Sequence, residues 1–201
     1  MPKMPEEYID IRKKQILNAA LECFTEMGYE RTTVRDIAKT MDVSTGVIYN
    51  YYKGKDDILK GIYELSLDNN ANLFNTIEQK NTFKEYIIAY FENVTGCCTD
   101  QEIRKSFKGN INFWAESLKN DKLNEMVVSS CNMFERKISE FVAKAKLNEE
   151  IDPGLDPEKY AMFFNALITG LQVRYVMNKD LDFSEICRDT INIITNNLWR
   201  K

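Results

Sequence analysis

Apolar residues recur at intervals of three and four along nearly the whole chain, and this spacing limits the possible folds more than any other feature. It places their side chains on one face of an α-helix. The first stripe consists of Ile16, Leu17, Ala20, Leu21, Phe24 and Met27, and others run through residues 83–94, 103–118, 123–145, 157–177 and 184–198. No strand-like alternation is apparent. The sequence therefore predicts an all-α protein.

Two short helices follow the first stripe. Gly28 suits the end of a helix, and Thr33 can cap a helix over residues 34–41. Asp42 and Val43 make a tight turn, and Ser44 or Thr45 can cap a third helix to about residue 51. Two such helices joined by a turn of three or four residues have the geometry of a DNA-reading helix-turn-helix.

The second of these helices carries small and polar groups that suit base edges and phosphates. They are Ser44, Thr45, Gly46, Tyr49, Asn50 and Tyr51. Gly46 would let the backbone approach DNA closely, and Asn50 could pair with adenine through two hydrogen bonds. The alternative is that any small helical hairpin has a polar exposed side, so spacing alone leaves both interpretations open.

Composition limits the other function classes. The chain contains no histidine, which excludes Ser/His/Asp and Cys/His triads and every metal site that uses histidine. We therefore expect no enzyme, no metal and no cofactor. The net charge is −4, but residues 1–60 hold ten basic and ten acidic residues, so the excess acid lies elsewhere. Lys39, Lys53, Lys55 and Lys60 could form a patch that faces phosphates.

The remaining sequence signals favour a cytoplasmic protein without a membrane span. No apolar run reaches ~18 residues, and the N-terminus lacks the apolar stretch of a secretory signal. The five cysteines are irregularly spaced, which disfavours a disulfide framework. The adjacent Cys97 and Cys98 could sense thiol oxidation, but two small residues at a helix end are the simpler interpretation.

The run from Gly28 to Ala38 and the run from Val43 to Leu59 resemble the N-terminal domain of TetR-type regulators. The shared pattern is glycine–aromatic, threonine, Ile-Ala, Ser-x-Gly, Tyr-x-Tyr-aromatic, and lysine before a leucine. It covers roughly residues 9–60, whereas the rest of the chain matches the family only in length and helical character. The resemblance implies a helix-turn-helix domain over residues 1–55 and a helical ligand-binding and dimerisation domain over residues 56–201.

The resemblance also implies roles for individual residues. Thr33 would cap the second helix against a phosphate, Lys55 would grip the DNA backbone, and the six residues of the third helix would line the DNA face. Tyr52 would belong to the core. A homodimer would place two reading helices in successive major grooves ~34 Å apart. The helices over residues 157–177 and 184–198 would form the dimer seam, with Leu171 and Ile194 among its apolar residues.

In this family the C-terminal helices enclose a ligand cavity, which implies a repressor released from its double-stranded DNA operator by a small effector. Aromatic residues are dense here and polar ones few, so we expect a mostly apolar effector, with Arg174 as the nearest cation for an anionic one. The candidate ligand-binding residues are Tyr90, Phe113, Trp114, Asn165, Gln172 and Tyr175. Two alternatives stay open: a regulator that recruits a protein partner without sensing a ligand, and a small helical enzyme with a vestigial DNA-binding domain.

Overall fold

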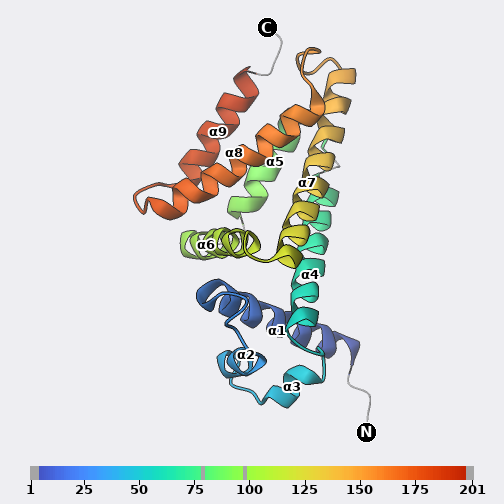
Figure 1. Cartoon of the computed structure of the whole chain (residues 1–201). Coiled ribbons are helices and arrows are strands. Elements are labelled where there is room, and N and C mark those ends of the chain that lie inside the picture. The colour runs from blue at the N-terminus through green and yellow to red at the C-terminus, as the bar shows by residue number, and fades with distance from the viewer. Residues whose placement is uncertain (1–4, 78–79, 97–98, 198–201) are drawn as a thin grey trace. The chain divides into compact units, whose positions relative to one another are not determined.

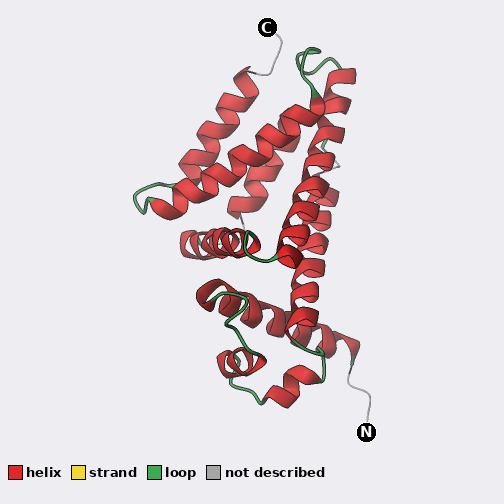
Figure 2. Ribbon diagram, viewed as in Figure 1, coloured by secondary structure: helices red, strands yellow, loops and turns green. Residues whose placement is uncertain are grey.

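The computed structural model describes residues 5–77, 80–96 and 99–197, and these residues contain helices joined by turns, with no strand (Figures 1 and 2). The helices are α1 (Glu6–Met27), α2 (Val34–Thr40), α3 (Thr45–Tyr49), α4 (Lys55–Ile77), α5 (Phe83–Gly96), α6 (Asp100–Ser117), α7 (Asp121–Leu147), α8 (Pro157–Met177) and α9 (Phe183–Asn197). The all-α prediction is confirmed. Cys97, Cys98 and Trp199 lie outside the described residues.

The chain forms two compact units that do not follow a simple N-terminal and C-terminal division. The first, here called the head unit, contains the described residues up to Asp68 together with Asn112–Asn124. The second, here called the core unit, contains Asn69–Ile111 and the described residues from Glu125 onward. The sequence-based boundary lay at residue 55. The helices α4, α6 and α7 each contribute residues to both units.

The head unit is built around the apolar face of α1. Ile16, Ala20 and Phe24 of this helix are almost completely buried, as are Ile37 of α2 and Ile48 of α3. The Cys23 thiol lies 3.2 Å from the Thr40 hydroxyl, which ties α1 to the end of α2. Tyr52 is also buried, as the resemblance implied. These contacts fix the positions of the two short helices.

Gly28 ends α1 in a backbone conformation that other residues rarely adopt. Its φ is +85°, and its N–H donates to the carbonyl of Phe24. A Cβ atom at this position would also lie 3.2 Å from a carboxylate oxygen of Glu116. The positive φ therefore favours glycine here, and a larger side chain would also have to displace the Glu116 carboxylate. The chain can then turn sharply from α1 into the loop that precedes α2.

Aromatic rings make up much of the interior of the core unit. The Tyr86 and Phe141 rings stack with their centroids 3.8 Å apart. The Tyr90 ring meets the Phe164 ring edge-on at 5.5 Å, and the Phe107 ring meets the Phe183 ring in the same way at 5.0 Å. These rings join α5, α6, α7, α8 and α9 around one apolar core.

The exposed apolar side chains of α8 and α9 differ from those expected for a dimer seam. Ile194 is only 7% exposed and belongs to the apolar core of its own chain, so its assignment to the seam is wrong. Leu171 is half-buried and packs against the same core. Helical spacing identified an apolar stripe here but could not tell which partner covers it. The large apolar side chains that remain exposed on these helices are Met162, Phe163, Met177 and Ile193.

Candidate nucleic-acid interface and buried pocket

The elements α2 and α3 form a helix-turn-helix whose first helix is capped and whose turn is closed by a backbone hydrogen bond. Thr33 caps α2 in a reciprocal arrangement, because its backbone N–H donates to the Asp36 carboxylate at 2.8 Å and the Asp36 N–H donates to its hydroxyl at 3.3 Å. In the turn, the Val43 N–H donates to the Ala38 carbonyl at 3.0 Å, and Asp42 adopts a φ of 53°. The turn therefore sets the direction in which α3 leaves α2.

The outer face of α3 presents most of the residues selected from the sequence. Ser44, Gly46, Tyr49 and Asn50 are exposed, and the Tyr49 side chain is 56% accessible. Thr45 and Tyr51 are half-buried. A Cβ atom on Gly46 would meet only the Ser44 hydroxyl, at 3.7 Å, so packing within the chain does not require glycine there. An exposed, open backbone at this position suits the close approach of another molecule.

Lys55 has a different environment from the one expected of a phosphate-binding residue. Its ammonium donates to the backbone carbonyls of Tyr29 at 2.8 Å and Glu30 at 3.2 Å. It also lies 4.3 Å from the centre of the Tyr29 ring, over its face. Lys55 thus fastens the loop after α1 to the start of α4. Binding a phosphate would require the ammonium to leave these carbonyls.

Two exposed cations near the helix-turn-helix were missed by the sequence reasoning. Arg31 and Arg35 are exposed immediately before and within α2, on either side of the Thr33 cap. Lys39, near the end of α2, and Lys53, between α3 and α4, are exposed as well. The available signal was the position of the two arginines beside a helix N-terminus, where phosphate groups bind favourably. The exposed positive charge of this region therefore comes from α2, the loop before it and the turn between α3 and α4.

Residues 112–124, here called the connector segment, are joined to the rest of the head unit by polar contacts. The Asn112 side chain donates to the Thr25 carbonyl at 2.9 Å, and the Asn120 side chain donates to the Glu30 carboxylate at 2.9 Å. The Lys122 ammonium lies 2.9 Å from the Asp56 carboxylate. The connector segment therefore contacts α1, the loop after it, and α4.

Asp56 links two of these elements. Its carboxylate accepts hydrogen bonds from the Tyr29 hydroxyl and the Lys122 ammonium, and these partners lower the pKa of Asp56 below its usual value. Burial and the neighbouring carboxylate raise the pKa of the Tyr29 hydroxyl, which keeps it protonated. The contact is therefore an ion pair joined to a neutral phenol near neutral pH.

The core unit contains an apolar pocket of about 60 Å³. Eight side chains line it: the amide of Gln172 and seven aromatic or aliphatic side chains, among which the Tyr90 hydroxyl is the one polar group. The seven are Tyr90, Phe91, Val94, Phe107, Ile168, Leu171 and Phe183. No charged residue is among them. The amide oxygen of Gln172 accepts a hydrogen bond from the Asn110 side chain at 3.2 Å. This pocket suits a neutral, mostly apolar molecule.

The six candidate ligand-binding residues do not lie together. Tyr90 and Gln172 line the pocket. Phe113 and Trp114 belong to the head unit. The Asn165 amide donates to Glu135 at 2.8 Å, and the buried Tyr175 hydroxyl bonds to Asp100. Arg174 is exposed and does not line the pocket, which removes the expected partner for an anionic effector.

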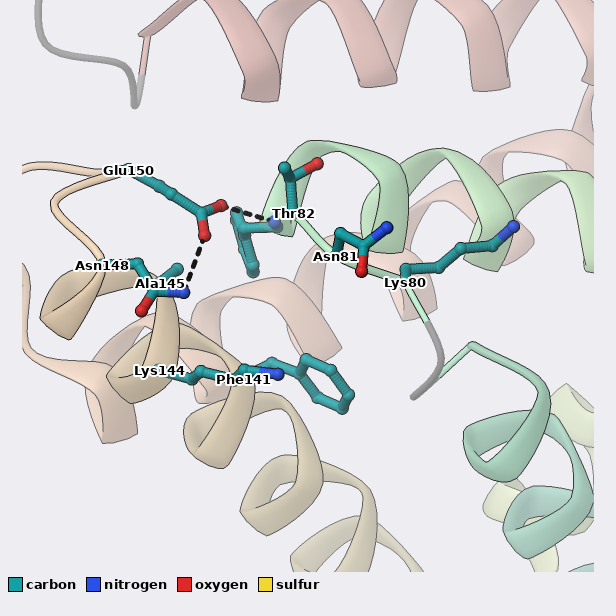
Figure 3. Close-up of a pocket in the computed structure, with 9 residues that line it drawn as sticks. Lys80, Asn81, Thr82, Phe141, Lys144, Ala145, Asn148 and Glu150 are labelled. Carbon is teal, nitrogen blue, oxygen red and sulfur yellow. Dashed lines mark hydrogen bonds between the residues drawn. The ribbon is translucent and has the colours of Figure 1, made fainter.

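A second, much smaller cleft lies between the start of α5 and the end of α7 (Figure 3). Its volume is about 10 Å³, which is the space of roughly one water molecule. The Glu150 carboxylate lines it and accepts hydrogen bonds from the Phe83 N–H at 2.7 Å and from the Asn148 side chain at 3.1 Å. Glu150 therefore caps α5, and the cleft has no space for an organic ligand.

The described residues hold neither a metal-binding cluster nor a helix that could cross a membrane. The described residues contain no group of three or more cysteine and carboxylate side chains placed to hold a metal ion. Burial raises the pKa of the Cys23 thiol, and it raises that of the Cys187 thiol to about 12, which disfavours their thiolate forms. Among the described helices, none combines the length and apolar character needed to cross a bilayer.

A helix-turn-helix with an exposed second helix, followed by a helical unit that encloses an apolar pocket, defines a class of DNA-binding regulator. The family model of bacterial regulatory proteins of the tetR family matches residues 16–62. The C-terminal model of BetI-type transcriptional repressors matches residues 95–194.

Individual relatives agree with these family models. The HTH-type transcriptional regulator YhgD of Bacillus subtilis is 30% identical over 80% of this chain and 82% of its own length. The fatty acid metabolism regulator protein of the same species is 24% identical over 93% of this chain and 95% of its own length. The crystal structure of a transcriptional regulator from Saccharomonospora viridis in complex with choline has a TM-score of 0.74 at 18% identity, and the match covers 94% of this chain and 98% of that one.

The chain belongs to the TetR family of bacterial transcriptional regulators. It is therefore a DNA-binding regulator, and the family resemblance drawn from residues 28–59 is confirmed.

Proposed function

We propose that this regulator is a dimeric repressor that leaves its operator when a small, neutral, mostly apolar molecule binds in the core unit. The observation that carries the proposal is the pocket lined by Tyr90, Phe91, Phe107 and Phe183, with Gln172 as its amide. Such a lining favours an apolar body and offers an amide hydrogen bond. An effector lowers operator affinity only to the extent that it binds the released conformation more tightly.

The DNA-binding residues of the proposed repressor are those of the α2–α3 surface. Thr33, Ser44, Gly46, Tyr49 and Asn50 support this assignment because they are exposed on the two short helices or their caps. Thr45, Tyr51 and Lys55 are the other residues of the set chosen from the sequence. Arg31 and Arg35 add positive charge. Phosphate contacts would give affinity, and Asn50 would supply base preference.

The absence of charged side chains from the pocket lining indicates the class of effector. A fatty acid carboxylate would lack a cation among the lining residues, although one relative is named as a regulator of fatty acid metabolism. Choline could use the aromatic faces, and a structurally similar regulator was crystallised with it. Neither charged group finds an oppositely charged side chain in the lining, so the neutral class has the stronger support.

The test begins with operator DNA selected from random fragments by the intact protein. Release is then followed by fluorescence anisotropy with benzyl alcohol, toluene, decanoic acid and choline. We expect benzyl alcohol to release DNA and to raise the melting temperature as its concentration increases, with weaker effects of the charged probes. A melting temperature that responds to neither neutral probe at millimolar concentration would argue against this pocket as the effector site.

A second candidate function is a regulator that recruits a protein partner without sensing a ligand. The pocket volume of about 60 Å³ favours it, because an engineered cavity in another protein holds benzene at ~150 Å³. A ligand-sensing regulator must therefore enlarge the pocket, whereas a protein-recruiting one need not. Insensitivity to all four probes, together with unchanged operator binding, would favour this candidate.

A further inference from the structure

Gln172, which lines the apolar pocket from α8, accepts a hydrogen bond from Asn110 of α6. Its amide oxygen lies 3.2 Å from the Asn110 side-chain nitrogen, and Gln172 is the amide among the eight lining residues. Resting on the proposed function, we propose that this amide pair is the contact an effector breaks, so that Asn110 and Gln172 set the equilibrium between operator-bound and released forms. The effector would then be an apolar molecule whose hydroxyl donates to Gln172 in place of Asn110.

The pocket cannot accept a ring-sized molecule without moving one of its walls. Its volume is about 60 Å³, and Phe107 of α6 forms part of its lining. Asn110 lies three residues after Phe107, so both side chains extend from neighbouring positions on one side of α6. Displacing the Phe107 ring therefore strains the hydrogen bond that Asn110 makes with Gln172.

The two amides differ in what they lose when the bond breaks. Asn110 is exposed, so its side chain can bond to water instead at little cost. Gln172 is half-buried and lines the pocket, so a hydroxyl inside the pocket can donate to its oxygen once Asn110 no longer does. A hydroxyl on the effector supplies that donor, whereas a hydrocarbon of the same size does not. The pair therefore favours hydroxylated effectors over pure hydrocarbons.

The helix α6 contains residues of both units, so a change at Asn110 can reach the head unit along this helix. Asn110 belongs to the core unit, and two residues later Asn112 donates to the Thr25 carbonyl within the head unit at 2.9 Å. Both lie in the uninterrupted helix Asp100–Ser117, whose backbone hydrogen bonds make it rigid over one turn. A rotation of α6 at Asn110 therefore also moves Asn112. Because coupling is reciprocal, loss of the amide pair should weaken operator binding even without effector.

The experiment measures operator affinity in the absence of any effector. Asn110→Ala, Gln172→Leu and the double variant are compared with the wild-type chain on the same selected operator. Asn132→Ala, an exposed asparagine on α7, serves as the matched control. We expect each single variant to bind operator about threefold to tenfold more weakly, the range that one hydrogen bond supports. The double variant should bind no more weakly than the weaker single variant.

The outcomes separate this inference from the proposed function. Gln172→Leu places an apolar side chain of similar size among the apolar lining residues, so its melting temperature and helical circular dichroism should match those of the wild type. Operator affinity of Asn110→Ala equal to that of Asn132→Ala, or losses that multiply in the double variant, would overturn the role of the amide pair alone. A wild-type chain that selects no operator at all would overturn the proposed function and this inference with it.

Discussion

Lys55 illustrates how a residue with a family role can have a second, structural one. Its ammonium donates to two backbone carbonyls and lies over the Tyr29 ring. The two roles make separable demands, because a structural contact contributes to folding and a phosphate contact contributes to the salt dependence of DNA binding. Lys55→Ala and Arg35→Ala can therefore be compared directly.

We expect Lys55→Ala to lower the free energy of unfolding by about 1 kcal/mol, since a half-buried charged hydrogen bond is lost. Its salt dependence of operator binding should stay close to that of the wild type. Arg35→Ala should leave stability unchanged and reduce the slope of log affinity against log salt concentration by about one unit. Urea denaturation and titrations at several salt concentrations measure both quantities. A reduced slope for Lys55→Ala would mean that its ammonium leaves the carbonyls when DNA binds.

Asn50 is exposed at the end of α3 and provides the test of base reading. Asn50→Ala should lower the binding free energy for the best operator by ~1–3 kcal/mol, because an amide pairs with adenine through two hydrogen bonds. The loss should be much smaller on an operator in which the base pair that Asn50 contacts has been changed. Affinities for a panel of single-base operator variants would reveal this. Equal losses on every sequence, like those of a phosphate contact, would show that Asn50 does not read bases.

At the level of helices and turns, ionisation of the Tyr52 hydroxyl, just after the helix-turn-helix, should affect the stability of the fold at alkaline pH. Burial, reinforced by the charge of Asp57, raises the pKa of Tyr52 to about 12. The folded state then retains a proton that the unfolded state releases above pH 10. The stability contributed by this group is complete below pH 10 and is lost as the pH rises toward 12.

Tyr52→Phe removes this titration, so its free energy of unfolding should fall less steeply than that of the wild type between pH 10 and 12. The difference should be roughly 1–2 kcal/mol at the upper end, because one pKa unit corresponds to ~1.4 kcal/mol. Tyr49→Phe, at an exposed position, is the control. Parallel pH profiles for wild type and Tyr52→Phe, measured by urea denaturation, would contradict the prediction.

Much of this element-level structure could be predicted from the sequence. The cap at Thr33, the turn at Asp42 and the helix that begins at Pro157 depend on local preferences, which act within a few residues. The carbonyl partners of Lys55 and the contact between Asn112 and Thr25 involve residues far apart in the chain. Helical periodicity carries no information about such pairs.

The residues of the pocket were also only partly predictable from the sequence. The family resemblance placed Tyr90 and Gln172 among the candidate ligand-binding residues, and both line the pocket. It placed Tyr175 and Asn165 there equally well. Their polar groups instead bond to Asp100 and Glu135, which are chosen by tertiary packing. The helices that carry these residues were predictable, whereas their orientation and their hydrogen-bond partners were not.

At the scale of the whole molecule, the exposed apolar side chains of α8 and α9 direct the test of dimerisation. Phe163 is 62% exposed in the single chain, whereas Ile194 is 7% exposed. Phe163→Glu should give folded monomers with weak operator binding, because a carboxylate in an apolar seam costs several kcal/mol. Ile194→Glu should instead unfold the core unit. Sedimentation and circular dichroism distinguish the two, and folded Phe163→Glu dimers would place the seam elsewhere.

The connector segment has a consequence for building hybrid regulators. A DNA-reading module exchanged between two regulators could be cut near the end of the helix-turn-helix, here around residue 55. In this chain such a cut would separate Thr25 and Glu30 from their partners at positions 112 and 120. A donated module would then arrive without these two hydrogen bonds to the connector segment. A functional transplant must carry two pieces of sequence, residues 1–68 and 112–124, although more than forty residues of the recipient lie between them.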